Sequence, residues 1–343
     1  MGGKIVKNKR KDSLSKSTTE LGEHNIIGLI QDHLDLMPNM PVPFGDDVSA
    51  FEIENERVVV LKTDMLTNKT DVPKEMSLWQ AARKTIVMNV SDFASKGVKP
   101  TAIIVSLGLP RTFTSKDIEE IACGLNAGAR EYGAYIIGGD TGETSDLIIA
   151  ASLFGMAQKK DLMLRKGAKA GDTLAVTGLF GKTGAGLKIL LNGFKATPKV
   201  KEKLVASVCM PKARLIEGLT LGASKTVTAS IDSSDGLAWS LHELSNNSNV
   251  GFTIDKVPIA KEVFQFAESN RLNPLELALY GGEEYELVVT IKTEVLEKTI
   301  KEIKNIGGCL IPIGTVTKDL KILIDIDGKR DLIEPRGWEH FKS

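Results

Sequence analysis

Five short segments of this 343-residue chain place aspartate beside glycine, serine or threonine. Oxygen ligands of this kind are what Mg²⁺ requires, and Mg²⁺ usually combines one or two carboxylates with substrate phosphates. The set therefore predicts several Mg²⁺ ions on a polyphosphate. Taken singly, each segment is also typical of an ordinary turn, because Asp and Gly dominate turns. The segments are Gly45-Asp46-Asp47, Thr63-Asp64, Ser91-Asp92, Gly138-Gly139-Asp140-Thr141 and Asp232-Ser233-Ser234-Asp235-Gly236.

Three further positions have both a functional and a structural interpretation. Glycines 281 and 282 either form a plain turn or bring Glu283 to a ligand. Arg165 is either a solvated charge or a partner of nucleotide oxygens. Tyr132 either packs at a helix end or stacks on a base. A P-loop at Gly178 to Thr183 is excluded, because only two residues separate the first Gly from the Gly-Lys pair where four are needed.

Composition excludes several functional classes. Lys+Arg and Asp+Glu are both 44, so net charge gives no case for nucleic acid or a membrane surface. The three cysteines and four histidines show no zinc or disulfide spacing, which favours a reducing cytoplasm. No apolar run approaches the roughly 18 residues of a membrane span. Any phosphate binding must then come from local groups or bound metal.

The elements that position these residues alternate between helix and strand. In the first half we expect helices at 20–36, 79–95 and 116–132, the last with Ser115 as N-cap, and strands at 47–53, 57–64, 102–109, 135–138 and 147–157. Strands that end at Asp64, Gly138 and Ile231 lead into the Asp-rich turns. In the second half we expect strands at 172–177, 226–231, 250–254, 285–291 and 322–326, with helices at 185–191, 212–221 and 237–245.

This length suggests two domains of about 150 residues each. Residues 1–19 are basic and Ser-rich, which predicts a disordered arm. A basic connector near 157–165 separates the halves, so we expect an N-terminal domain over 20–157 and a C-terminal α/β domain over 158–343. The fold class is α/β (α+β).

The ordered segments, together with Asn89-Val90-Ser91-Asp92, Gly281 to Leu287 and Gly337 to Phe341, resemble the thiamine-monophosphate kinase family. That family belongs to the aminoimidazole ribonucleotide synthetase superfamily, with a two-domain PurM-like fold. The resemblance implies transfer of the ATP γ-phosphoryl group to thiamine monophosphate, with several Mg²⁺ ions. It also implies a homodimer whose N-terminal sheets form a barrel, with ATP in a cleft between the two domains and near the dimer interface.

The resemblance also implies roles for individual residues, with none catalytic beyond the metal ligands. The expected Mg²⁺ ligands are Asp47, Thr63, Asp64, Asp92, Asp140, Asp232 and Asp235; the expected ATP contacts are Tyr132, Gly139, Asp140, Arg165 and Ser234; the expected substrate contacts are Asp71, Glu283 and Trp338.

Two departures and two rival functions stay open. Lys62 stands where some relatives carry a small hydroxyl that helps hold metal, so we expect no side-chain ligand there. Asp71 stands where many bacterial relatives have a substrate-touching His, and a carboxylate suits the cationic thiazolium. The rivals are another ATP-using synthetase of the superfamily and a non-catalytic nucleotide- or metal-binding module. For selenophosphate synthesis the expected N-terminal Cys is missing, since the first cysteine is Cys123.

Overall fold

The computed structural model describes residues 16–35, 37–326 and 328–341. Most of the expected disordered arm therefore lies outside the described residues. The chain divides into a small unit, formed by the described residues up to Asn39 with 338–341, and a large unit, Met40–Gly337. In the described part of the chain, no helix has the length and apolar character needed to cross a membrane.

The small unit contains two short helices where the sequence predicts one. α2 (Thr18–Leu21) and α3 (Glu23–Gln31) are separated by Gly22, whose φ of 71° lies in the left-handed region that favours glycine. The backbone N–H of His340 donates to the Glu23 carboxylate at 3.2 Å, which ties residues 338–341 to α3.

The first sheet of the large unit has five strands in the order β1-β2-β5-β3-β4. Its pairs are antiparallel except for β3 with β4. β2 pairs with β5 from Arg57 opposite Gln158 to Thr67 opposite Ile148. Asp64 thus lies within β2 and Asp140 within β4, so the predicted turns there are wrong. The strands are β1 (Ser49–Glu52), β2 (Arg57–Thr67), β3 (Pro100–Leu109), β4 (Tyr135–Glu143) and β5 (Ile148–Gln158).

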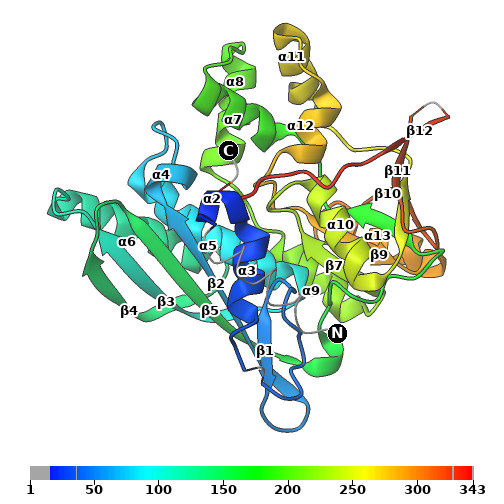
Figure 1. Cartoon of the computed structure of the whole chain (residues 1–343), viewed down its shortest axis with the longest axis horizontal. Coiled ribbons are helices and arrows are strands. Elements are labelled where there is room, and N and C mark those ends of the chain that lie inside the picture. The colour runs from blue at the N-terminus through cyan, green and yellow to red at the C-terminus, as the bar shows by residue number, and fades with distance from the viewer. Residues whose placement is uncertain (1–15, 36, 327, 342–343) are drawn as a thin grey trace, which may run out of the picture. The chain divides into compact units, whose positions relative to one another are not determined.

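Two helices pack on one face of this sheet, α5 (Leu78–Ser95) and α6 (Ser115–Glu131) (Figure 1). A capping box of Ser77 and Gln80 begins α5. Thr114 and Asp117 begin α6, one residue before the predicted cap. Buried α5 side chains such as Ile86, Val90 and Phe93 join the strands in one core. This packing sets the position of the polar residues on α5.

The second sheet has seven strands in the order β12-β11-β8-β10-β6-β9-β7. β7 ends at Asp232 and pairs with β9, so it carries the predicted acidic turn at the sheet's edge. The strands are β6 (Thr173–Val176), β7 (Val227–Asp232), β8 (Gly251–Ile254), β9 (Leu287–Ile291), β10 (Ile311–Thr317), β11 (Ile322–Ile326) and β12 (Lys329–Leu332).

Four helices of the second half were not predicted from the sequence, namely α8, α11, α12 and α13. Helices α7, α8, α11 and α12 contact one another and form a group beside the sheet (Figure 1). The helices are α7 (Lys182–Asn192), α8 (Pro198–Cys209), α9 (Leu215–Ser224), α10 (Leu237–Ser248), α11 (Lys261–Asn270), α12 (Pro274–Tyr280) and α13 (Leu296–Asn305); the short turns are α4 (Asn68–Asp71), η1 (Lys159–Asp161) and η2 (Thr293–Val295).

Candidate active site

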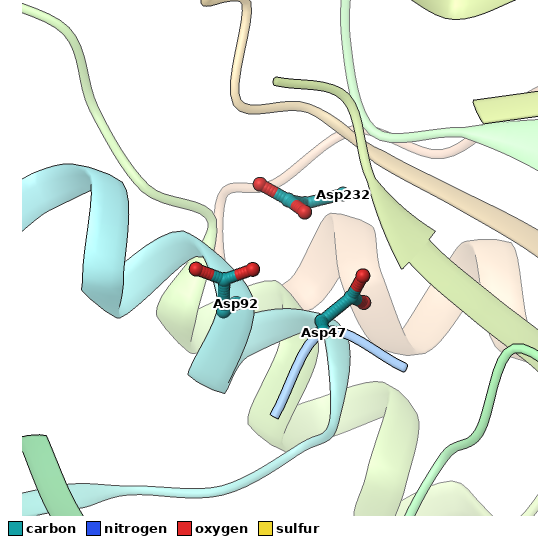
Figure 2. Close-up of side chains that lie close together, drawn as sticks. All are labelled: Asp47, Asp92 and Asp232. Carbon is teal, nitrogen blue, oxygen red and sulfur yellow. The ribbon is translucent and has the colours of Figure 1, made fainter. Parts of the chain in front are cut away.

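Three aspartates from distant parts of the chain meet in the large unit. Asp47 precedes β1, Asp92 lies in the last turn of α5, and Asp232 ends β7 (Figure 2). All three are buried, and one carboxylate oxygen from each lies within 4.8 Å of the others. The sequence separates them by up to 185 residues, the difference between positions 47 and 232. The packing of α5 between the two sheets brings them together.

The carboxylate of Asp47 lies between two cations. Arg165 Nη2 approaches Asp47 Oδ1 at 2.5 Å, and Lys96 Nζ approaches Oδ2 at 2.8 Å. The Ser95 hydroxyl donates to Oδ2 at 2.5 Å. Burial alone would raise the pKa of Asp47, but Arg165 and Lys96 hold it well below its ordinary range. Asp47 is therefore ionised, and the expected ATP contact Arg165 is engaged by Asp47 and by Glu243 at 3.0 Å.

The carboxylates of Asp92 and Asp232 receive less compensation from neighbouring cations than the carboxylate of Asp47 does. Burial raises the pKa of Asp92 well above its ordinary value, although Lys62 opposes the shift. Burial, and next the negative Asp47, raise the pKa of Asp232 to about 6. Among the described residues, no Lys, Arg or His forms an ion pair with Asp232, whose Oδ2 accepts from Ser91 at 2.5 Å. Buried carboxylates whose protonation is favoured in this way suit a hard divalent cation.

Asp64 lies beside this group on β2. Lys62 Nζ contacts Asp64 Oδ1 at 3.0 Å and Asp92 Oδ2 at 3.1 Å. The Asp64 backbone N–H donates to Asn89 Oδ1 at 3.0 Å, which fixes this part of β2 against α5. The Lys62 ammonium thus donates to both carboxylates, and the expectation that its side chain is no metal ligand stays a prediction.

The remaining expected ligands lie apart from the three-aspartate group. Thr63 alternates with Asp64 along β2, and its hydroxyl donates to the Ala151 carbonyl at 3.2 Å on the opposite face. Asp140 is exposed on the edge strand β4. Asp235 follows β7 by three residues and shares a loop with Asp232. The structure therefore brings Asp64 alongside the group and does not bring the Thr63 hydroxyl or Asp140 into it.

The expected ATP contacts other than Arg165 lie on three elements. Gly139 is on β4, where a Cβ would stand 2.0 Å from the Val105 carbonyl, so only glycine fits. Ser234 is exposed in the loop after β7. Burial raises the pKa of the Tyr132 hydroxyl to about 12, and that hydroxyl accepts from the backbone N–H of Ala213 at 3.0 Å. Tyr132 therefore packs at a helix end, and its stacking role stays a prediction.

Two expected substrate contacts meet through a residue that sequence reasoning missed. Lys84, buried in α5, pairs with the Glu283 carboxylate and donates to the Asp71 carbonyl at 3.1 Å. Glu283 Oε2 is buried without a hydrogen-bond partner among the described residues. The Asp71 carboxylate accepts from the Thr67 backbone N–H at 2.7 Å, so it also closes its own turn. Trp338 belongs to the small unit, where its ring meets His340 edge-on.

The loop before β9 is held against the acidic turn. The Glu283 N–H donates to Ser234 O at 2.5 Å and the Tyr285 N–H to Ser233 O at 2.9 Å. Both donors adopt positive φ, at 64° and 53°, which is strained for side-chain-bearing residues. Glu284 accepts from the Thr183 N–H at 3.2 Å. This bond uses a backbone donor at the start of α7.

Sequence reasoning missed a polar face of α5. Lys84, Ser91 and Ser95 follow one another at spacings of seven and four residues in α5, a spacing that puts them on one face of the helix. Ser91 and Ser95 donate to Asp232 and Asp47. That spacing was the available signal.

The chain is similar to known proteins over most of its length. The AIR synthase related protein N-terminal domain matches residues 45–157, and the corresponding C-terminal domain matches 169–326. The thiamine-monophosphate kinase of Nitrosopumilus maritimus is 37% identical over 298 residues, 87% of this chain and 93% of that protein. The thiamine-monophosphate kinase of Pyrococcus horikoshii is 38% identical over 301 residues, with 87% and 91% covered.

Solved structures resemble this chain as well. The structure described as "AaThiL complexed with AMPPCP and TMP" has a TM-score of 0.83 and 28% identity, and the match covers 95% of this chain and 99% of that one. The expected two-domain PurM-like fold of mixed α/β content is confirmed by these matches. On these grounds the chain belongs to the thiamine-monophosphate kinase family.

Proposed function

We propose that this protein transfers the γ-phosphoryl group of ATP to the phosphate of thiamine monophosphate, which yields thiamine diphosphate and ADP. The buried group of Asp47, Asp92 and Asp232 carries the proposal, because three close carboxylates can hold the Mg²⁺ that phosphoryl transfer from ATP uses. The AaThiL structure with AMPPCP and TMP supports the choice of both substrates.

Asp47, Asp92 and Asp232 would hold Mg²⁺, with Asp64 beside them, and we extend the ligand set to Thr63, Asp140 and Asp235 as the resemblance implies. The close carboxylate oxygens and the raised pKa of Asp92 and Asp232 fit a divalent cation. When bound, Mg²⁺ neutralises phosphate charge and orients the phosphates. Lys96 and Arg165 keep Asp47 ionised, and Ser91 and Ser95 orient two of the carboxylates.

The attacking atom in this proposal is a phosphate oxygen of the substrate. A phosphate monoester has a second pKa of about 6, so it is largely dianionic at neutral pH. No general base is then needed, and the protein's task is to position two polyanions in line. We therefore propose direct transfer without a phosphoenzyme.

At the substrate end, we propose that Glu283 accepts a hydrogen bond through its unpartnered Oε2, while Lys84 fixes its other oxygen. Asp71 and Trp338 complete the expected contacts. At the nucleotide end, we retain Tyr132, Gly139, Asp140, Arg165 and Ser234. Contact between Arg165 and ATP requires the guanidinium to exchange Asp47 or Glu243 for phosphate oxygens.

We propose a homodimer formed through the face of the five-stranded sheet opposite α5 and α6, with the two sheets closing a barrel. Large apolar side chains alternate onto this face, and their exposed fractions reach 56% for Met65, 51% for Ile104 and 69% for Ile137. A contiguous exposed apolar face is a feature of interaction surfaces. In this proposal residues 20–157 bind Mg²⁺ and ATP and form the dimer contact, and residues 158–343 supply Asp232, Asp235 and Glu283.

The three cysteines are thiols, so we place the protein in the reducing cytoplasm.

The proposed transfer is tested with γ-labelled ATP and thiamine monophosphate. The label should move to thiamine diphosphate and never to the protein. A trapped labelled protein would overturn direct transfer, and nucleotide binding without any transfer would favour a non-catalytic module.

A further inference from the structure

Lys62 places a positive charge among carboxylates that face one another from a strand and a helix. Its ammonium lies 3.0 Å from Asp64 Oδ1 and 3.1 Å from Asp92 Oδ2. Asp64 belongs to β2 and Asp92 to α5, so this one group joins two elements. The Lys62 side chain is 21% exposed, hence largely removed from solvent.

The other cations of the centre lie on a different side. Lys96 and Arg165 pair with Asp47, and neither forms an ion pair with Asp64 or Asp92 among the described residues. Without Lys62, Asp64 and Asp92 would face each other with no compensating side chain. Two carboxylates that share a site repel unless a cation or a proton intervenes.

We propose that Lys62 is a built-in cation that occupies the position between Asp64 and Asp92 which a divalent ion would otherwise take. An ammonium group is a compact point charge with three donors, so it can bridge two carboxylates as a small ion does. Lys62 thereby holds β2 and α5 together in the metal-free chain. It also lowers the number of divalent ions that the chain binds by one. The inference rests on the proposed function only in that these carboxylates belong to the Mg²⁺ centre.

The test counts Mn²⁺ ions on the full chain by electron paramagnetic resonance, without nucleotide. Lys62→Met removes the charge and keeps the length of the side chain, and Lys62→Arg keeps the charge. The matched control is Lys159→Met, which breaks an exposed pair with Glu52 on the same sheet. We expect Lys62→Met to bind one more Mn²⁺ per chain than wild type. Lys62→Arg and Lys159→Met should match wild type.

A thermal readout guards against loss of fold. In a chelator, Lys62→Met should melt below wild type, and saturating Mn²⁺ should raise its melting temperature by more than that of wild type. Equal Mn²⁺ counts and equal thermal shifts in wild type and Lys62→Met would overturn the role of Lys62. No Mn²⁺ on either protein would overturn this role and the proposed metal centre together. If Lys62→Met binds an extra Mn²⁺ but wild type forms no product from thiamine monophosphate, the proposed role of Lys62 is supported and the proposed substrate is wrong.

Discussion

The ammonium of Lys84 and the carboxylate of Glu283 form an ion pair between α5 and the loop before β9. Lys84 is fully buried, and it also holds the Asp71 carbonyl. Helix and loop come from opposite halves of the chain, so Lys84 fixes two of the three expected substrate contacts, Asp71 and Glu283, relative to each other.

Lys84→Met should destabilise the fold by about 3 kcal/mol, because it leaves the Glu283 carboxylate unpaired. In urea unfolding, the double variant with Glu283→Gln should lose less stability than the sum of the two single variants. The exposed pair of Lys329 and Asp331 serves as a control, where Lys329→Met should cost less than about 1 kcal/mol. Additive losses for Lys84 and Glu283 would show that the pair is not coupled.

Asp232→Asn should lower kcat by at least about a hundredfold, because it removes charge where the phosphates' counter-ion would bind. Stability should hold, since Asp232 has no ion-pair partner among the described residues and its burial disfavours the charged form. Asp255→Asn, at an exposed position after β8, is the matched control and should retain wild-type kcat. Steady-state kinetics measures kcat of both variants, and circular dichroism checks that both are folded. Near-normal turnover of Asp232→Asn would show that Asp232 is not part of the metal centre.

Much of this centre could be read from the sequence because its parts are local signals. Asp47, Asp92 and Asp232 each stand in a recognisable turn or helix end, and periodicity located α5 and β7. The sequence could not show that Asp64 and Asp140 lie inside strands, because the pairing that extends β2 and β4 is with distant segments. The role of Lys84 could not be predicted for a related reason. A lysine is buried only where it has polar partners, and the partners of Lys84 are remote in sequence.

The stability of the protein should fall as pH rises from about 4.5 to about 7 through Glu284. Burial raises the pKa of Glu284 from 4.5 to about 7, so the folded state favours the protonated acid. A raised folded pKa gives stability that is fully present below the unfolded pKa and lost above the folded one. Glu284→Gln should therefore be more stable than wild type at pH 8, by on the order of 3 kcal/mol.

Urea unfolding at pH 5 and pH 8 checks this prediction. Glu284→Gln should show a smaller change in unfolding free energy between the two pH values than wild type. An unchanged pH dependence would mean that Glu284 is ionised in the fold at both.

Ile137→Glu should convert the proposed dimer to a monomer, because it places charge on the apolar face of the five-stranded sheet. Ile137 is 69% exposed, and Leu332 on β12 of the other sheet is 64% exposed. Leu332→Glu should accordingly leave the molecular mass unchanged. Light scattering after gel filtration distinguishes the two, and a wild-type mass of 37.1 kDa would contradict the dimer outright.

Asp71→Asn separates two roles of one side chain. The amide oxygen can still accept from the Thr67 N–H and close the turn, while the negative charge is lost. If Asp71 faces the thiazolium, KM for thiamine monophosphate should rise about tenfold, with kcat and KM for ATP little changed. An unaltered KM for thiamine monophosphate would limit Asp71 to closing its turn.

The most direct measurement incubates the purified protein with Mg²⁺, ATP and thiamine monophosphate and separates the products by chromatography. The proposed transfer predicts thiamine diphosphate and ADP in equal amounts, dependent on Mg²⁺ and lost in Asp232→Asn. ADP without thiamine diphosphate, or no ADP at all in a protein that binds Mg²⁺ and ATP, would contradict it.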